Sequence, residues 1–362
     1  MKVLLSWIND YVNTSNIELK TLVKGLTDAG FEVEEVIDKS KGLDHVVVAN
    51  ITEITRHPNA DKLVICQCTY GFGQTQIVTH ATNMKVGDNV VLALDGANLP
   101  NGACIKNGEL RGVPSNGMFC AGEELCIDDS IYPGASIDGL LILAPDCVPG
   151  TPIAEVLGLN EVVLDVNVLP NRADCNSIYA IAKEIGAIFD LPVKPLDLTY
   201  TATGSKKVDV KVEATDLCPR YESVVVENVK NGASPAWMQK RLTLLDHTPH
   251  SLYVDITNYV LLEVGQPMHA FDLSKIKGNQ IIVRRAHNGE KLLTLDEKEH
   301  ELNPENLVIA NAEEPMVIAG IMGGMESGTY ETTQSVMLES ANFHFANIRR
   351  SAHALGMLSD SC

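Results

Sequence analysis

Long apolar runs and clustered cations are what this sequence has least of. No stretch of its 362 residues approaches the roughly 18–20 consecutive apolar residues that a membrane-spanning helix needs, and the apolar run at the start is too short for a signal peptide. Hydrophobic residues still make up 45% of the chain, and the mean hydropathy is near zero. These features predict a cytoplasmic globular protein with two or three domains and no membrane partner.

Cysteine is scattered rather than paired. The chain has nine cysteines, an odd number, and it contains no CxxC motif. Structural zinc sites usually draw their ligands from short paired spacings. We therefore expect free, mostly buried thiols and no metal site.

The charge balance is strongly acidic. There are 28 Lys and Arg residues against 47 Asp and Glu residues, which gives a formal net charge of −19. Neutralisation of phosphates drives most non-specific nucleic-acid affinity, so a chain of this charge repels RNA on average. The basic pairs Lys206-Lys207, Arg284-Arg285 and Arg349-Arg350 are too short to reverse that. Any RNA contact must come from a shaped local site or from a partner subunit.

Residues 1–38 and 150–200 read as small mixed α/β pieces. Ser15 and Glu18 have the spacing of a capping box, which predicts a helix that ends near Gly30 and is followed by a strand. Residues 150–200 combine a strand with a helix whose isoleucines recur on one face. Before that helix, Arg172 and Asp174 are candidates for a site, but a capping and turn role is favoured. A linker rich in Thr, Gly and Ser follows.

Residues 39–149 contain many short β-rich runs separated by Gly, Asn and Asp. Short strands at this spacing favour a small barrel or sandwich. Two sequences stand out within it, HPNADKL at 57–63 and GVPSNGMFCAGEEL at 112–125. Both are rich in the residues that form tight turns.

The stretch DITNYVLLEVGQPMHAFD, residues 255–272, is the most informative part of residues 206–362. An apolar helical run is stopped by Gly265-Gln266-Pro267, because proline lacks an N–H and disfavours helix in the residue before it. His269 follows this rigid turn. Further on, VIAGIMGG at 317–324 is an apolar strand that runs into glycines, and VMLESANF at 336–343 places Glu339 among apolar neighbours.

These motifs, in this order, resemble the bacterial phenylalanyl-tRNA synthetase β subunit. The matching strings are HPNADKL, GVPSNGMFCAGEEL, PNRADC, VDITNYV with GQPMHAFD, IAGIMGG and LESANF. The resemblance implies an α+β multidomain fold. A small discontinuous α/β domain (1–38 plus 150–200) would carry an inserted OB-fold β-barrel (39–149) that binds tRNA. A mixed α/β B3/B4 editing domain (206–362), incomplete at its C-terminus, would follow.

The resemblance implies that the B3/B4 domain hydrolyses tyrosine wrongly esterified to phenylalanine tRNA. A pocket for Phe cannot strongly exclude an added hydroxyl, whereas a site with a buried acceptor can demand that hydroxyl. Glu339 matches the family glutamate that accepts from the tyrosine OH. His269 matches the histidine near the ester, where it would place a water or the terminal adenosine, or act as a general base. From spacing alone, a water-facing Glu339 and a structural His269 remain the alternatives.

The remaining predicted site residues also come from the resemblance. Thr257 and Asn258 match polar pocket positions. Ala319, Gly320 and Gly323 match a wall of small residues that leaves room for an aromatic side chain.

Three departures from the family pattern accompany these matches. Thr248 stands where an arginine of the editing site is expected, and Ser251 where an asparagine is expected. THATN at 79–83 replaces a typical Cys-Gly-Ala-x-Asn. The altered segment keeps open a non-catalytic tRNA-binding or assembly module that has lost editing. A stand-alone hydrolase is disfavoured by the acidic charge.

The resemblance also implies partners. The chain would assemble with the phenylalanyl-tRNA synthetase α subunit into an α2β2 heterotetramer and would bind tRNA(Phe). ATP and Mg²⁺ would serve the intact enzyme on the α subunit, so no cofactor is expected on this chain. Whether the HPNADKL and SNGMFC motifs contact tRNA or only shape turns and core is left open by the sequence.

Overall fold

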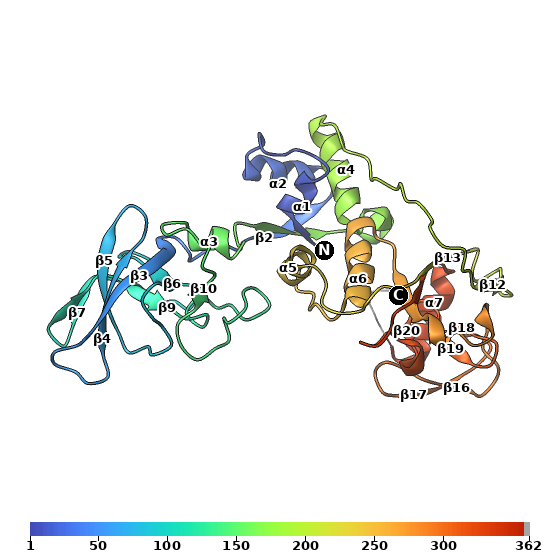
Figure 1. The fold of residues 1–362 in the computed structure, drawn as a ribbon. Helices are drawn as coiled ribbons and strands as arrows, with labels where there is room; N and C mark the ends of the chain where they lie inside the picture. The colour runs from blue at the N-terminus through green and yellow to red at the C-terminus, as the bar shows by residue number, and fades with distance from the viewer. Residues whose placement is uncertain (358–362) are drawn as a thin grey trace. The chain divides into compact units, whose positions relative to one another are not determined.

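A computed structural model describes residues 1–357, and the last five positions of the predicted B3/B4 domain lie outside that range. The chain divides into two compact units (Figure 1). The first comprises Met1–Trp7, Glu32–Asn167 and Thr243–Leu245, and the second holds the other described residues. Among the described residues, no helix has the length and apolar character to cross a membrane.

One sheet of the first unit joins distant parts of the sequence. Strands β1 (Lys2–Leu4) and β2 (Glu32–Asp38) both pair antiparallel with the central strand β11 (Val162–Asn167). Leu164 lies opposite Val3 on one side and opposite Val36 on the other. The two halves of the predicted discontinuous domain therefore contribute strands to the same sheet.

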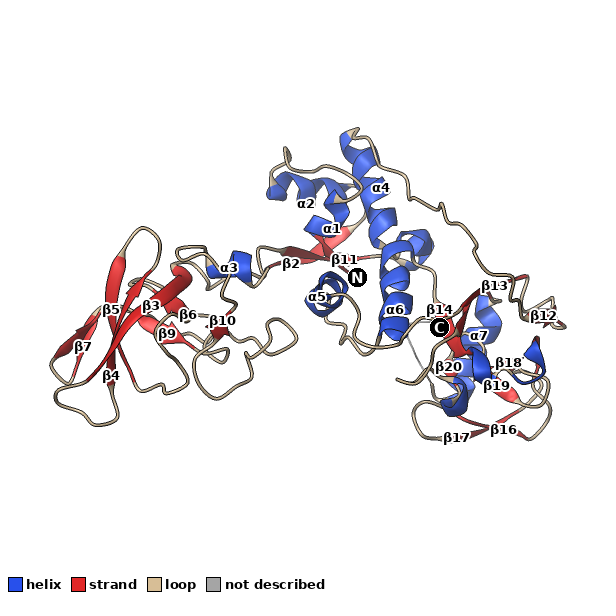
Figure 2. Ribbon diagram, viewed as in Figure 1, coloured by secondary structure: helices blue, strands red, loops and turns tan. Residues whose placement is uncertain are grey.

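The inserted segment forms a six-stranded antiparallel sheet (Figure 2). Its strands are β3 (Val46–Arg56), β4 (Val64–Thr69), β5 (Gln74–Thr79), β6 (Asn89–Ala93), β9 (Met118–Cys120) and β10 (Ile142–Leu143). The short strands β7 (Gly108–Leu110) and β8 (Val113–Ser115) form a hairpin, and helix α3 (Ile153–Val156) follows the sheet. Apolar side chains alternate inward and fill a common core that includes Ile51, Ile77 and Leu92.

The two conspicuous motifs of this segment make turn and core contacts. In HPNADKL, the amide of Asn59 donates to Nδ1 of His57, and the other ring nitrogen of His57 lies 3.0 Å from the carbonyl oxygen of Leu110. In SNGMFC, the hydroxyl of Ser115 accepts from the amide of Val78 and is buried. These bonds agree with a role for both motifs in shaping turns and core.

Short helices account for the rest of the N-terminal segments. They are α1 (Leu5–Asn9), α2 (Leu19–Asp28), the 3₁₀ turn η1 (Pro170–Cys175) and α4 (Ile178–Phe189). The predicted capping box is wrong: the N-cap of α2 is Glu18, without a side-chain cap bond, and the amide of Ser15 turns back to Asn13. Gly30, at φ +93°, ends the region as predicted.

The second unit carries two main sheets. A five-stranded sheet has the order β12 (Asp209–Val212), β15 (Gln280–Arg285), β18 (Leu307–Ala310), β19 (Pro315–Ile318) and β20 (Met322–Gly323), with only the β12–β15 pair parallel. A three-stranded antiparallel sheet has the order β13 (Arg220–Val226), β21 (Val336–Asn342) and β14 (Met268–Asp272). Buried aliphatic side chains from both sheets share one core.

Helices and smaller elements complete this unit. Besides α2, α4 and η1, its helices are α5 (Ala236–Leu244, nearly all of it), α6 (Leu252–Val264) and α7 (Phe345–Leu355). The other 3₁₀ turns are η2 (Leu273–Lys275), η3 (Lys277–Asn279) and η4 (Met325–Ser327), and β16 (Glu290–Leu293) pairs with β17 (Glu299–Leu302). The mixture of helices and sheets agrees with the predicted α+β class (Figure 2). No described cysteine forms a disulfide, and most of them are buried, as expected.

Candidate functional site

A cavity of about 330 Å³ lies where the two main sheets of the second unit meet helix α7. His269 on β14 and Glu339 on β21 both line it, and they are direct partners in the antiparallel register. Side chains that lie opposite each other on neighbouring strands project to the same face. The imidazole and the carboxyl group are therefore neighbours on one wall of the cavity, although 70 residues separate them in the sequence.

The turn before β14 positions His269. Helix α6 ends at Gly265, whose φ of +77° is the left-handed conformation that glycine adopts without strain. Pro267 then commits the chain to the extended conformation of β14. The side-chain amide of Gln266 donates to the carbonyl oxygen of Ala341, which ties the turn to β21. The Gly-Gln-Pro signal therefore fixes where the strand that carries His269 begins.

Both polar side chains have buried atoms without hydrogen-bond partners. Glu339 is 5% exposed, and its Oε2 atom has no partner. His269 lines the cavity and is half-buried as a residue, but its Nε2 atom is inaccessible and also unpaired. An unpaired buried polar atom costs about 1–3 kcal/mol. A ligand with polar groups at these two atoms would recover that cost.

Burial sets the protonation of the pair. Removal from water raises the pKa of Glu339 to about 8 and lowers the pKa of His269 to about 4. At neutral pH the site therefore holds a carboxylic acid beside a neutral imidazole. The neutral acid can both donate and accept a hydrogen bond. A general base works best with a pKa near the working pH, so this His269 is better suited to orienting a water than to removing its proton.

Glycines form part of the cavity wall. Gly320 and Gly323 both line it. A Cβ atom at Gly323 would lie 3.0 Å from Cε1 of His269, and one at Gly320 would lie 3.2 Å from Cγ2 of Ile348. Gly320 also has φ +67°. The absence of side chains at these positions therefore leaves space beside His269 and at the foot of α7.

Ala319 is fully buried in the apolar core and is not among the lining residues. Its amide donates to the carbonyl oxygen of Leu307. Ala319 therefore supports the wall from behind.

Thr257 and Asn258 lie on α6, and neither lines the cavity. The hydroxyl of Thr257 donates to the carbonyl oxygen of Val254 one turn earlier in the helix. Their role as pocket residues stays a prediction. The neighbouring Asp255 is buried and structural, since it accepts from the amide of His250 and the hydroxyl of Ser234.

Thr248, the departure from the family pattern, is exposed in the loop before α6 and is not among the lining residues. Ser251 is the N-cap of α6 and makes no side-chain cap bond. The altered segment therefore precedes the helix and does not supply a polar group to the cavity.

Tyr221 on β13 is a residue that the sequence did not single out. It lies opposite Ala341, and Ser223 lies opposite Glu339, so Tyr221 is a diagonal neighbour of Glu339 on the same face. Its hydroxyl is buried without a hydrogen-bond partner. Burial, and then the proximity of Glu339, raise the pKa of Tyr221 above its ordinary value. Only the pairing of β13 with β21 reveals this proximity.

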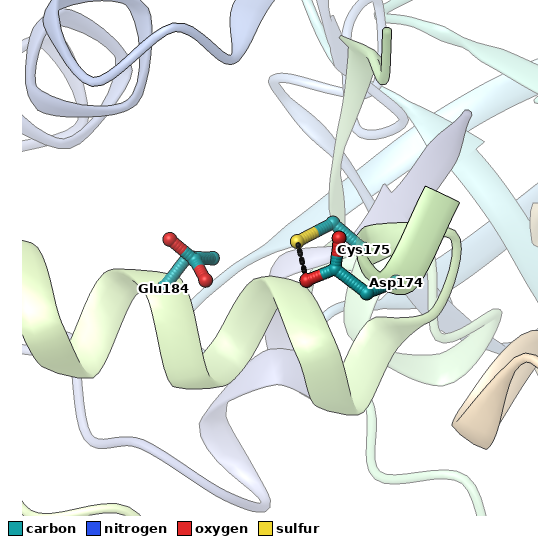
Figure 3. Close-up of side chains that lie close together, drawn as sticks. All are labelled: Asp174, Cys175 and Glu184. Atoms are coloured by element: carbon teal, nitrogen blue, oxygen red, sulfur yellow. Dashed lines mark hydrogen bonds between the residues drawn. The ribbon is translucent and has the colours of Figure 1, made fainter. Parts of the chain in front are cut away.

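A second polar cluster is formed by Asp174 and Cys175 in η1 and by Glu184 in the middle of α4 (Figure 3). Its three ligand-type atoms are close enough to suggest a metal. However, Nη2 of Arg172 lies 2.7 Å from Oε1 of Glu184, 3.2 Å from Oδ2 of Asp174 and 2.9 Å from Sγ of Cys175. The hydrogen bonds from Arg172 hold the pKa of Asp174 below its ordinary value. The guanidinium already occupies the centre of the cluster and offsets one of its two carboxylate charges, which fits the turn role predicted for Arg172 and Asp174.

Comparison with known proteins matches both regions of the chain. A tRNA binding domain family matches residues 46–149, and the B3/4 domain family matches residues 217–362. The second match includes every residue named above as lining the cavity.

The whole chain is similar to known proteins. The chain is 43% identical to the phenylalanine–tRNA ligase β subunit of Moorella thermoacetica and 44% identical to that of Clostridium acetobutylicum, and both matches cover 100% of this chain. The β subunit of Syntrophus aciditrophicus is 42% identical, again over 100% of the chain. The chain spans 44–46% of the length of these relatives. It belongs to the phenylalanine–tRNA ligase β-subunit family.

Proposed function

We propose that the cavity is an editing site that hydrolyses tyrosine wrongly esterified to tRNA(Phe). The observation that carries the proposal is the buried pair His269–Glu339, with one unpaired polar atom on each side chain, on a wall that also contains Gly320 and Gly323. Such a site offers apolar surface to an aromatic ring and a hydrogen-bonding group to a phenolic hydroxyl.

Discrimination follows from Glu339. A bound tyrosyl group would bring its hydroxyl to the neutral carboxyl group, which both donates and accepts. A phenylalanyl group would leave Oε2 of Glu339 buried and unpaired. The difference of about 1–3 kcal/mol corresponds to roughly 5- to 150-fold in favour of the tyrosyl ester.

Hydrolysis needs a water placed at the ester carbonyl carbon. His269 lies next to Glu339 in the register, and its Nε2 is unpaired. Once the ring turns so that this buried atom faces the cavity, Nε2 would accept a hydrogen bond from that water. The water attacks the carbonyl carbon, the bond to the ribose oxygen breaks, and the products are free tyrosine and tRNA with its hydroxyl restored. The low pKa of His269 assigns it to positioning the water, so a neighbouring ribose hydroxyl would assist the proton transfer.

The tRNA-binding region would be an OB-fold barrel spanning residues 39–149. The six-stranded antiparallel order and the match at 46–149 support this proposal. It is inserted into a discontinuous domain of residues 1–38 plus 150–200, and residues 206–362 form the editing domain. The sheet shared by β1, β2 and β11 supports the discontinuous arrangement.

Within the whole enzyme, this chain would act beside an α subunit in an α2β2 heterotetramer in the cytoplasm. Synthesis of phenylalanyl-tRNA(Phe) from ATP, phenylalanine and tRNA, with Mg²⁺, would take place on the α subunit. This portion would supply tRNA binding and editing. The relatives named above, which match over the whole chain, support the assignment.

Hydrolysis of preformed tyrosyl-tRNA(Phe) tests the editing proposal. We expect release of tyrosine by this chain, alone or with the α subunit, and a large loss in His269→Ala. His287→Ala is the matched control, because His287 is exposed and does not line the cavity.

No hydrolysis, even with the α subunit present, would favour the second candidate, a non-catalytic tRNA-binding or assembly module. The position of Thr248 in an exposed loop away from the lining is the observation that favours it. Restored hydrolysis in Thr248→Arg would trace the loss to that substitution.

A further inference from the structure

We propose that Phe345 and Arg349, with His344, form a nucleotide-binding platform at the rim of the cavity that holds the terminal adenosine of the aminoacyl ester. The proposal rests on the editing function proposed above. It assigns a binding site to His344 and Phe345, which the sequence did not single out, and to Arg349, which it offered only as part of a short basic pair.

Phe345 combines two properties that rarely occur together. It lines the same cavity as Glu339, and yet it is 80% exposed. Phe271, on the strand that carries His269, is by contrast fully buried. Phe345 is the first residue of α7, and the ring of His344 stacks beside it with centroids 5.6 Å apart and planes 9° from parallel. The stacked pair presents a flat aromatic surface at the cavity opening.

Arg349 adds a cation to this surface. It lies four residues after Phe345 in the same helix, so the two side chains share one face. Arg349 is exposed, and it forms no ion pair within residues 1–357. Carboxylates pair with five other arginines, namely Arg172, Arg220, Arg241, Arg284 and Arg285, whereas Arg56, Arg111 and Arg350, like Arg349, form no ion pair within residues 1–357. An uncompensated guanidinium in a chain of charge −19 is a local exception to the acidic surface.

The geometry of the substrate points to the same place. If the amino acid occupies the buried end of the cavity, the adenosine that carries it must lie at the opening. A purine ring stacks on an aromatic side chain whatever its sequence context, and a guanidinium binds a phosphate through paired N–H donors. Phe345, with His344 stacked behind it, would stack on the adenine, and Arg349 would bind the phosphate that precedes it. A shaped local site of this kind is what the acidic chain requires for RNA contact.

Two substrates separate the platform from the amino-acid pocket. Tyrosyl-tRNA(Phe) carries the adenosine, whereas tyrosine ethyl ester lacks it. With Phe345→Ala, we expect KM for tyrosyl-tRNA(Phe) to rise by about 5- to 150-fold with kcat unchanged. Hydrolysis of the ethyl ester and the preference for tyrosyl over phenylalanyl esters should not change. Phe345→Trp should retain the wild-type KM, because it keeps an aromatic face.

The arginine has a matched control in the same helix. Arg350 is also exposed, but its Nε donates to the carbonyl oxygen of Ala346 in its own helix. Arg349→Gln should weaken binding of tyrosyl-tRNA(Phe) and reduce its dependence on salt, whereas Arg350→Gln should do neither. Equal effects of the two substitutions would show a diffuse charge effect and would overturn the role of Arg349.

Binding of the trinucleotide CCA to the full chain keeps the platform testable without hydrolysis. If the wild type hydrolyses neither ester but loses CCA binding on Phe345→Ala, the editing proposal fails and the platform stands. If Phe345→Ala binds CCA as the wild type does, or impairs the ethyl ester as much as the tRNA ester, the platform is refuted.

Discussion

Glu290, which is nearly buried, and Glu339, which is buried, are two glutamates of the same unit with opposite surroundings. Glu290 receives both ends of the Arg284 guanidinium, at 2.7 and 2.9 Å, and an amide hydrogen bond from His287. Burial acts to raise its pKa, but these bonds hold the pKa below its ordinary value. Glu339 has no such partner, and burial alone raises its pKa to about 8. Removing one partner of a buried ion pair destabilises a fold, whereas an unpaired carboxyl group that lines a cavity is a candidate for binding a ligand.

The largest change in the free energy of unfolding should come from removing the arginine that pairs with Glu290. Arg284→Ala leaves Glu290 nearly buried without its cation, since both side chains are about one-eighth exposed (13% and 12%). We expect a loss of about 3–5 kcal/mol in the free energy of unfolding, measured in urea. Lys291→Ala, which removes an exposed ion pair with Glu299, should change it by less than about 1 kcal/mol. Similar losses in both variants would show that the Arg284–Glu290 pair is not special.

The unpaired Glu339 should make the free energy of unfolding depend on pH. The folded pKa of Glu339 is raised, so its contribution to stability is lost as pH rises toward about 8. The folded pKa of His269 is lowered, so its contribution is lost as pH falls below about 6.5 toward 4. Between about 4.5 and 6.5 the two slopes cancel. From pH 6.5 to 8, the wild type should lose up to about 2 kcal/mol relative to Glu339→Gln.

The difference in unfolding free energy between the wild type and Glu339→Gln isolates the effect of Glu339 from that of other titrating groups. Urea unfolding of both proteins at pH 6.5, 7 and 8 measures this difference. A constant difference across this range would mean that Glu339 is ionised in the folded protein, contrary to the burial described above.

A substitution at Gly323 tests whether hydrolysis depends on the position of the His269 ring. Gly323→Ala would place a methyl group 3.0 Å from Cε1 of His269 and displace the ring. We expect hydrolysis of tyrosyl-tRNA(Phe) to slow by about tenfold or more, because small displacements of a positioning group are costly. Gly328→Ala is the control, since its methyl group would meet only ordinary contacts at 3.8 Å. Unchanged hydrolysis in Gly323→Ala would remove His269 from the reaction.

Removing the hydroxyl of Tyr221 should change the stability least, and it should not be destabilising. Its buried hydroxyl has no partner, so Tyr221→Phe should leave stability unchanged or raise it by about 1 kcal/mol. In Tyr253 the hydroxyl donates to the carbonyl oxygen of Val229 at 2.7 Å, so Tyr253→Phe should destabilise by about 1 kcal/mol. Equal destabilisation in both would show that Tyr221 has a hydrogen-bond partner, of which Glu339 is the nearest candidate.

Local signals in the sequence predicted the elements that carry the site but not their pairing. The stop at Gly265-Gln266-Pro267 and the apolar strand around Glu339 follow from backbone chemistry that acts over a few residues. The register that sets His269 opposite Glu339 depends on contacts between distant strands, which no local pattern encodes. The same limit hid Tyr221, whose importance arises only from its neighbour across the sheet.

Other differences have equally physical causes. The spacing of Ser15 and Glu18 suits a capping box, but helix α2 begins later, where Glu18 itself is the N-cap. Ala319 was grouped with its glycine neighbours by the resemblance, yet it packs into the core, because the turn after β19 holds it there through the bond from its amide to Leu307. Thr257 and Asn258 were placed in the pocket by resemblance alone, and this structure does not bring them to the cavity lining.

The most direct test of the account is the ratio of kcat/KM for tyrosyl-tRNA(Phe) to that for phenylalanyl-tRNA(Phe), in the wild type and in Glu339→Ala. If Glu339 recognises tyrosine, the wild-type ratio is much greater than 1. The ratio should fall by roughly 5- to 150-fold in Glu339→Ala, because the group that pairs with the phenolic hydroxyl has been removed. A ratio that stays the same in Glu339→Ala would contradict the claim that this buried, unpaired carboxyl group recognises tyrosine.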